Sequence, residues 1–256
     1  MLTPRVVGTT IAAFIVLLGL LAPLIAPYPP NQMFLESILL PPNSQFWLGT
    51  DALGRDVLSR LLYGAQTSLG VGLVAVGLAI GLGIIVGLAS GLGGRFTDAL
   101  LMRLTDIMLT FPTIFLILAV IAILKPSLLN VMIIIGLTSW MGVARLVRAE
   151  ALSLKSRPYI QSATLGGTRP IRMAWRHVLP NLLPPIATSA SLGLAAAILT
   201  EAGLSYLGLG VQPPTPSWGA MMTEGKSVME VAWWLTALPG LAILLTVLGF
   251  TLAVEK

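Results

Sequence analysis

Residues 145–177 read RLVRAEALSLKSRPYIQSATLGGTRPIRMAWRH, and they separate two uncharged stretches, 126–144 and 178–200. The segment holds seven lysines and arginines against the single acid Glu150, so it is too polar to cross a bilayer. Its 33 residues also exceed the roughly 2 to 8 residues of an ordinary connection between bundled helices. These features favour a docking surface for a soluble partner. The alternative is a basic surface that lies on anionic lipid.

The same segment carries the signals of two short helices joined by a turn. Gly166-Gly167 is typical of a helix end, Thr168 can cap a new helix, and Pro170 suits a first helical turn. We therefore predict a helix over about 159–166, a turn at the two glycines and a second helix over about 168–177.

The composition indicates an integral membrane protein. Of the 256 residues, 56% are hydrophobic before glycine is counted and only 10% are charged, against roughly 25% charged in soluble domains. The mean hydropathy is +0.92. Six uncharged stretches are long enough to cross a bilayer, namely 6–26, 61–94, 107–124, 126–144, 178–200 and 231–254. The predicted fold class is an all-α integral membrane protein with six transmembrane helices.

Two further segments are predicted not to cross. The uncharged stretch 202–223 has prolines at 213, 214 and 216, so we expect a loop at membrane level. Residues 28–60 form a polar excursion whose end has apolar and charged residues on opposite helical faces, which predicts an amphipathic helix at the interface. The apolar face would hold Leu53, Val57, Leu58, Leu61 and Leu62, and the charged face Arg55, Asp56 and Arg60.

We divide the chain into an anchor span with its extracytoplasmic segment, 1–66, and a five-span core, 67–256, which includes a coupling segment, 145–180. The first span is taken as an uncleaved anchor rather than a secretory signal.

The basic residues predict the topology. With the N-terminus inside, the cytoplasmic side holds eleven lysines and arginines and the other side four, Arg55, Arg60, Lys125 and Lys226. This distribution obeys the positive-inside rule and places both termini in the cytoplasm. The excess of basic over acidic residues is thus explained by the membrane topology, and no nucleic-acid partner is expected.

Most site chemistry is excluded by residue counts. There is no cysteine and one histidine, so cysteine zinc sites, iron–sulfur clusters and multi-histidine metal sites are ruled out. Gly225-Lys226-Ser227 resembles the end of a phosphate-binding P-loop, but the motif needs a glycine where Ala220 stands. A serine protease site fails because His177 is the only candidate base and belongs to another span. We expect neither an enzyme nor a cofactor bound by this chain.

Three smaller features leave alternatives open. The glycine pairs of the second span, Gly77/Gly81, Gly83/Gly87 and Gly87/Gly91, favour close packing within the bundle over a subunit interface. Arg103 and Asp106 are spaced for a local ion pair on one helix. Glu201 falls about 30 Å along its helix, near the outer surface, where it is either interfacial or part of a pathway.

Residues 161–180, QSATLGGTRPIRMAWRHVLP, resemble the cytoplasmic signature of binding-protein-dependent ABC importer permeases. That signature is EAA, three residues, glycine, nine residues, then Ile-x-Leu-Pro. Gln161-Ser162-Ala163 stands for EAA and Gly167 for the glycine, with matching spacing. Gln161 and His177 depart from the pattern, and losing the acid puts a specific ionic contact there in doubt.

Two more segments resemble the dipeptide, oligopeptide and nickel permeases, in their second-permease branch. They are WLGTDALGRDVLSRLLYGAQTSL at 47–69 and LSYLGLGVQPPTPSWGAMM at 204–222. That subfamily usually continues past its last span with a tail of Gly-Asp, Arg-Asp and Asp-Pro, whereas the sequence here ends in AVEK, so no role of the tail is carried over.

The resemblance implies a type I ABC importer permease fold with a cytoplasmic coupling helix between spans four and five. It implies half of a translocation pathway for short peptides, or nickel, in a bacterial or archaeal plasma membrane. The implied partners are a homologous permease, two ATPase subunits that bind ATP and Mg²⁺, and an extracytoplasmic binding protein. The coupling residues would be Tyr159, Ile160, Gln161, Ser162, Ala163, Thr164, Leu165, Gly166, Gly167 and Thr168, and the pathway residues Glu201 and Tyr206.

The rival function is an ion-coupled secondary carrier or a channel. Such a protein normally shows paired intramembrane acids or an inverted repeat, and this sequence offers only Asp106 and Glu201 and no detectable repeat. A scaffold subunit without a pathway is a further alternative.

Overall fold

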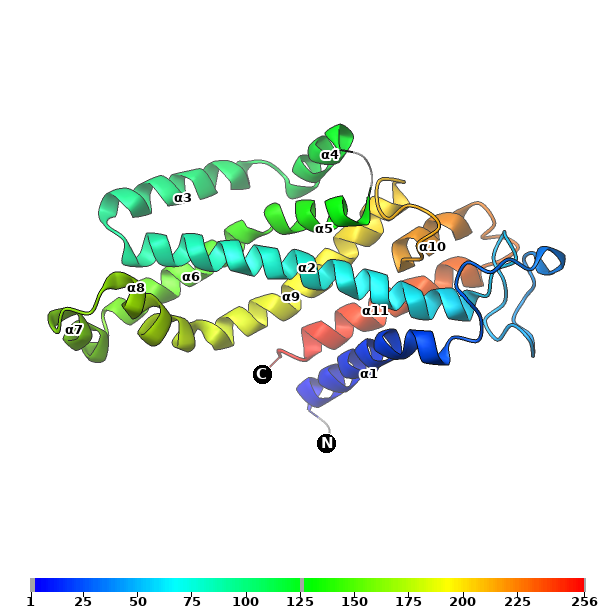
Figure 1. Cartoon of the computed structure of the whole chain (residues 1–256), viewed down its shortest axis with the longest axis horizontal. Helices are drawn as coiled ribbons and strands as arrows, with labels where there is room; N and C mark the ends of the chain where they lie inside the picture. Colours follow the sequence, from blue (N-terminus) through cyan, green and yellow to red (C-terminus); the bar gives the residue numbers. More distant parts are fainter. Residues whose placement is uncertain (1–2, 125–126, 256) are drawn as a thin grey trace. The chain divides into compact units, whose positions relative to one another are not determined.

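The computed structural model describes residues 3–124 and 127–255, which are helices and connecting loops (Figure 1). Lys125 and Lys256, which enter the predicted charge distribution, lie outside the described residues. The helices are α1 (Pro4–Ile25), η1 (Leu35–Ser37), α2 (Val57–Leu92), α3 (Arg95–Thr110), α4 (Thr113–Ile123), α5 (Leu128–Leu137), α6 (Trp140–Lys155), α7 (Pro158–Leu165), α8 (Pro170–Met173), η2 (Ala174–Val178, a π-helical turn), α9 (Leu179–Tyr206), α10 (Trp218–Lys226) and α11 (Trp234–Leu252).

Five helical stretches of the described chain are long and apolar enough to cross a membrane. They are Pro4–Ile25, Val57–Leu92, Leu128–Lys155, Pro170–Tyr206 and Trp234–Leu252. A sixth candidate is the pair α3 and α4, which bend by 83° at the break between them. The sequence predicted one uninterrupted span over 107–124. The structure instead breaks it at Pro112, which lacks the N–H of a helical residue and disfavours helix in the residue before it.

Contacts divide the chain into two compact units. The first comprises Met1–Leu73, Leu124–Met132 and Ser191–Lys256, and the second Val74–Ile123 and Ile133–Ala190. This grouping follows spatial contact, and the division of the sequence at residue 66 stays a prediction.

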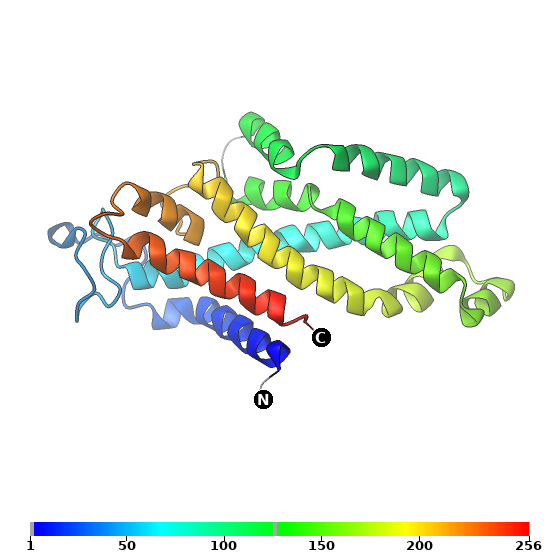
Figure 2. The same ribbon diagram turned by 180° about the vertical axis from the view of Figure 1, so that it is seen from behind.

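In the first unit α1 and α11 lie side by side and antiparallel, as two opposite views show (Figures 1 and 2). Gly8 allows the close approach because it has no side chain. A Cβ added there would lie 2.6 Å from the Leu252 Cβ, which is too close for two carbon atoms that are not bonded. The start of α1 therefore meets the end of α11. A core of Ile15, Ala65, Ile198, Trp218 and Ile243 joins these helices to α2, α9 and α10.

The second unit holds the glycine-rich half of α2 against α6. A Cβ at Gly83 would lie 2.5 Å from the Val143 Cβ, and one at Gly87 2.6 Å from the Val147 Cβ. Packing within the chain thus explains the pairs Gly83/Gly87 and Gly87/Gly91, as predicted. It does not explain Gly77 and Gly81, which have no neighbour within 4 Å of an added Cβ among the described residues.

The predicted interfacial helix before the second span is wrong. Helix α2 begins at Val57 and runs without a break to Leu92, while Leu53 lies in the preceding turn. The charged residues Arg55, Asp56 and Arg60 are buried rather than turned to solvent.

The predicted local pair Arg103–Asp106 is also wrong. Helix α6 lies beside α3, and Arg145 Nη2 donates to Asp106 Oδ1 at 2.5 Å.

Candidate functional site

The sequence signature at 159–168 forms a two-turn helix, α7, followed by a tight turn. Pro158 occupies the first helical position, where a helix needs no N–H donor. The side-chain amide of Gln161 donates from Nε2 to the Ser156 carbonyl at 3.3 Å. Within α7 only Ile160 is buried, whereas Tyr159, Gln161, Ser162, Thr164 and Leu165 are exposed. Leu165 is 89% exposed, so its apolar side chain is not covered by the described chain.

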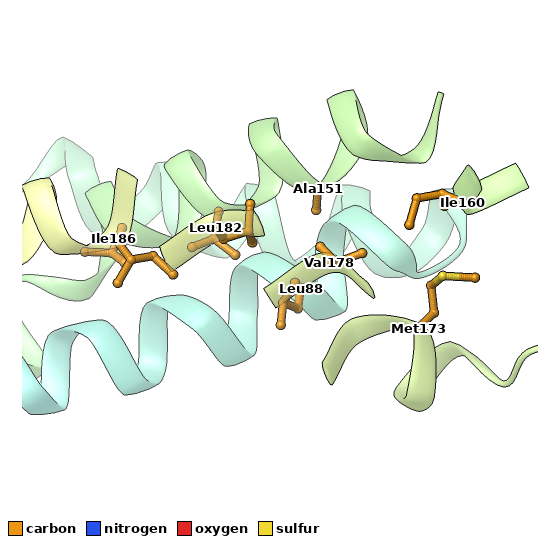
Figure 3. Packing of buried hydrophobic residues seen from close by; sticks show 9 residues of the cluster. Leu88, Ala151, Ile160, Met173, Val178, Leu182 and Ile186 are labelled. Atoms are coloured by element: carbon orange, nitrogen blue, oxygen red, sulfur yellow. The ribbon is translucent and has the colours of Figure 1, made fainter. Parts of the chain in front are cut away.

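The buried Ile160 anchors α7 to the transmembrane helices of the second unit. It belongs to a cluster with Leu88 of α2, Ala151 of α6, Met173 of α8 and Leu182 of α9 (Figure 3). The full cluster also includes Val143, Val147, Val178 and Ile186. Through Ile160, α7 therefore belongs to the same apolar cluster as side chains of α2, α6, α8 and α9.

The turn after α7 is a Schellman motif. The Thr168 N–H donates to the Ala163 carbonyl at 3.1 Å and the Gly167 N–H to the Thr164 carbonyl at 3.0 Å, which is the 6→1 and 5→2 pattern of this motif. Gly167 has φ +77°, the left-handed conformation that side chains oppose, whereas Gly166 has φ −70°. The predicted turn is confirmed. Thr168 is not the cap of the next helix, because its amide completes this motif and the N-cap is Arg169.

Glu201, one of the two predicted pathway residues, is fully buried in the first unit. The hydroxyls of Ser205 and Ser217 donate to its Oε1 at 2.7 and 2.8 Å, and Ser68 lies 3.5 Å from Oε2. The Ser205 hydroxyl also accepts from the Val211 amide at 3.1 Å. The carboxylate thus joins α9 and α2 to both ends of the proline-containing loop 207–217.

Tyr206 lies in a different environment from Glu201. Its ring is partly exposed at the end of α9, and the Lys226 Nζ lies 4.6 Å from the ring centroid. The two predicted pathway residues are therefore not brought together as one polar site.

A second polar cluster, which the sequence did not predict, lies where the 26–56 segment enters α2. Arg55 Nε is 2.6 Å from Asp51 and its Nη2 is 2.7 Å from Glu224, and Arg60 Nη2 is 3.0 Å from the same Glu224 carboxylate. Asp56 caps α2 by accepting from the Ser59 amide at 2.8 Å. The signal available in the sequence was the density of charges of both signs at 51–60, in a chain that has few.

No group of three or more His, Cys, Asp or Glu side chains is placed to hold a metal ion within residues 3–124 and 127–255. In the described part of the chain the carboxylates of both clusters accept hydrogen bonds from side chains, whereas the buried Arg60 Nη1 has no hydrogen-bond partner. The arrangement suits helix positioning, and the exposed surface of α7 suits binding to another protein.

Comparison with known proteins identifies the family to which this membrane-helix protein belongs. Residues 79–256 match the family described as binding-protein-dependent transport system inner membrane component, and residues 5–42 match the N-terminal transmembrane domain of oligopeptide transport permease C. The chain belongs to the family of binding-protein-dependent transport system inner membrane components. It is an integral inner-membrane permease subunit of an ABC importer, which confirms the prediction of a transport subunit rather than an enzyme.

Curated relatives are similar over nearly the whole chain. A di/tripeptide transport system permease protein of Pseudomonas aeruginosa (strain UCBPP-PA14) is 43% identical over 96% of this chain and 83% of its own length. A probable D,D-dipeptide transport system permease protein of Escherichia coli (strain K12) is 42% identical with the same coverage. A solved structure of the MetNI methionine ABC transporter, in an inward-facing conformation, matches with a TM-score of 0.59 at 18% identity, over 77% of this chain and 97% of that one. This likeness confirms the type I ABC importer permease fold.

The charge cluster yields a stability prediction. Replacing Glu224 by alanine leaves Arg55 and Arg60 buried with Asp51 as their nearest acid, and breaking a buried ion pair from one side costs about 3 kcal/mol. Glu224→Ala should therefore lower the midpoint of heat-induced unfolding of the purified chain, whereas Glu230→Ala, at an exposed position between α10 and α11, should not. Equal midpoints for the two variants would contradict a stabilising role for the cluster.

Proposed function

We propose that this chain forms half of a translocation pathway for short peptides and that residues 159–168 couple the pathway to separate ATPase subunits. The observation that carries the proposal is the geometry of α7, an exposed two-turn helix that is held by the buried Ile160 and ended by the turn at Gly167. A partner that binds the exposed face of such a helix can displace it as a rigid unit. The solute class follows from the relatives, which are named for di/tripeptides and for D,D-dipeptides.

The partners proposed are those of an importer that receives its solute from a binding protein. They are a homologous second permease subunit, two nucleotide-binding subunits that hold ATP and Mg²⁺, and an extracytoplasmic solute-binding protein. The family description supports the last of these. Within the pathway, we assign Tyr206 to contact with solute because it is exposed, and Glu201 to holding the 207–217 loop behind it.

Uptake by reconstituted vesicles tests the transport function. Vesicles that contain the chain, its second permease and its ATPase subunits should accumulate a labelled dipeptide when ATP is enclosed and the binding protein is outside. Vesicles with this chain alone should accumulate none, with or without an ion gradient. Uptake by the chain alone, driven by an ion gradient, would instead favour the ion-coupled carrier.

Two glycine substitutions that add the same methyl group test the coupling role. Gly167→Ala forces a side chain into the left-handed conformation at a cost of about 1–2 kcal/mol, a factor of about 5 to 30 in an equilibrium. Gly166→Ala has negative φ and its Cβ would lie 3.4 Å from the Ser162 carbonyl oxygen, so it should be tolerated. In the assembled transporter, dipeptide-stimulated ATPase activity should fall about 5- to 30-fold for Gly167→Ala and stay near wild type for Gly166→Ala.

Both variants should insert normally, since the cost is small against the insertion of the membrane helices. If Gly167→Ala kept full peptide-stimulated ATPase activity, residues 159–168 would not be the coupling element. The basic segment would then be better explained as a surface that lies on anionic lipid.

The orientation proposed has both termini in the cytoplasm. The eleven-to-four distribution of basic residues supports it, as does the contact of Gly8 with Leu252, which brings the two ends of the chain to the same side. Reporter fusions after Gly94 and Lys155 should give a cytoplasmic signal, and fusions after Gln45 and Thr223 an extracytoplasmic one. A cytoplasmic signal at Thr223 would overturn the assignment of the 202–223 loop.

A further inference from the structure

The second unit contains an apolar groove that is lined neither by the proposed coupling residues 159–168 nor by the proposed pathway residues Glu201 and Tyr206. It has a volume of about 760 Å³ and runs between the second half of α2 and the start of the Pro170–Tyr206 helix. Its walls are hydrophobic side chains, glycine and proline: Gly81, Ile85 and Gly94 on α2 and the loop after it, and Ile171, Trp175 and Leu179 opposite. Ile171 is 70% and Trp175 64% exposed, so these large side chains are not covered by the described chain.

The groove has the length of one bilayer leaflet. From Gly81 to Leu92, the last residue of α2, the rise of 1.5 Å per residue gives about 17 Å, against about 15 Å for half of a 30 Å hydrocarbon core. Both walls belong to helices that are candidate membrane spans. The groove therefore has the dimensions and the polarity that an acyl chain requires.

Basic residues flank the groove at the end of α2 and along the first turns of the opposite helix. The two walls are antiparallel, so the end of α2 meets the start of the opposite helix. Four arginines directly adjoin lining residues in the sequence: Arg95 follows Gly94, Arg169 precedes Pro170, Arg172 follows Ile171, and Arg176 follows Trp175. All four are exposed, and none forms an ion pair with any described residue. The two acids on neighbouring α3, Asp98 and Asp106, are already paired with Arg148 and Arg145, each at 2.5 Å.

We propose that this groove is a binding site for an anionic phospholipid, with an acyl chain along α2 and the phosphate held by the arginines at the open end. A guanidinium matches the geometry of phosphate, and basic pockets between membrane helices are suited to anionic headgroups. Trp175, which lines the groove and stands between Arg172 and Arg176 in the sequence, is the residue type enriched at the boundary of hydrocarbon and headgroup. A zwitterionic lipid would fill the apolar part but would gain no net attraction from four positive charges.

Quenching of tryptophan fluorescence by brominated lipid tests this site. The full chain, together with any subunits that co-purify with it, is placed in phosphatidylcholine vesicles that contain either brominated phosphatidylglycerol or brominated phosphatidylcholine at the same mole fraction. The difference between wild type and Trp175→Phe isolates the signal of Trp175. We expect the phosphatidylglycerol probe to quench Trp175 several-fold more strongly than the phosphatidylcholine probe.

Two pairs of variants separate the charge from the groove. Arg172→Gln with Arg176→Gln should abolish the preference for phosphatidylglycerol, whereas Lys155→Gln with Arg157→Gln, which are exposed in the same basic segment but adjoin no lining residue, should preserve it. Gly81→Leu should fill the deep end of the groove and reduce quenching by both probes. Gly77→Leu is its matched control, because an added Cβ meets open space at both glycines but only Gly81 lines the groove.

Two results would overturn the proposal. Equal quenching by the two probes would mean that the groove holds lipid without regard to charge. Quenching by neither would mean that another protein chain, such as the second permease subunit, covers it. Both results come from the wild-type and Trp175→Phe proteins alone, so they decide the question even if a groove variant fails to insert. The measurement uses neither ATP nor peptide and is independent of the proposed transport function.

Discussion

A backbone in hydrocarbon must satisfy its own hydrogen bonds, and the rest of this structure depends on how it does so. Helices meet the requirement within a single segment, so it is the breaks between helices that need other partners. The loop 207–217 finds them in Glu201, whose carboxylate accepts from Ser205 and Ser217 while Ser205 in turn accepts from the loop amide of Val211. A buried carboxylate is costly unless it is hydrogen-bonded in this way, and here the same bonds fix the path of the loop.

Charges are buried at the entry to α2 for a different reason. The segment 26–56 is irregular, and side-chain ion pairs link it to the helices. Arg55 bridges Asp51, within the segment, to Glu224 on α10, and Asp56 supplies the cap that α2 needs. Ion pairs of this kind contribute little net stability, because desolvation offsets most of the attraction, but losing one partner is expensive. Their effect is to specify one arrangement of the segment over others.

Features that depend on a residue and its immediate neighbours could be predicted from the sequence. Five of the six predicted spans followed from gaps between charges, and the turn after α7 followed from Gly166-Gly167, since a left-handed residue is a local need. Partners distant in the sequence could not be predicted. Asp106 is three residues from Arg103 but pairs with Arg145, and Arg55 pairs with Glu224, which is 169 residues away. The charged face before α2 looked like a face toward water because a helical pattern does not distinguish solvent from a buried partner of opposite charge.

The apolar cluster around Ile160 bears on how motion at α7 would reach the membrane helices of the second unit. Ile160 is packed with Val147, Val178 and other side chains from α2, α6 and α9, and such interiors are close-packed and resist compression. A displacement of α7 would therefore shift these helices together rather than be absorbed locally. The Schellman turn adds a second constraint, because it fixes the angle between α7 and the chain that continues into α8 and α9. ATP bound elsewhere can bias such a movement only if its subunit contacts α7 differently in the two states. The exposed Tyr159 and Leu165 are the side chains of α7 that offer apolar surface for such a difference.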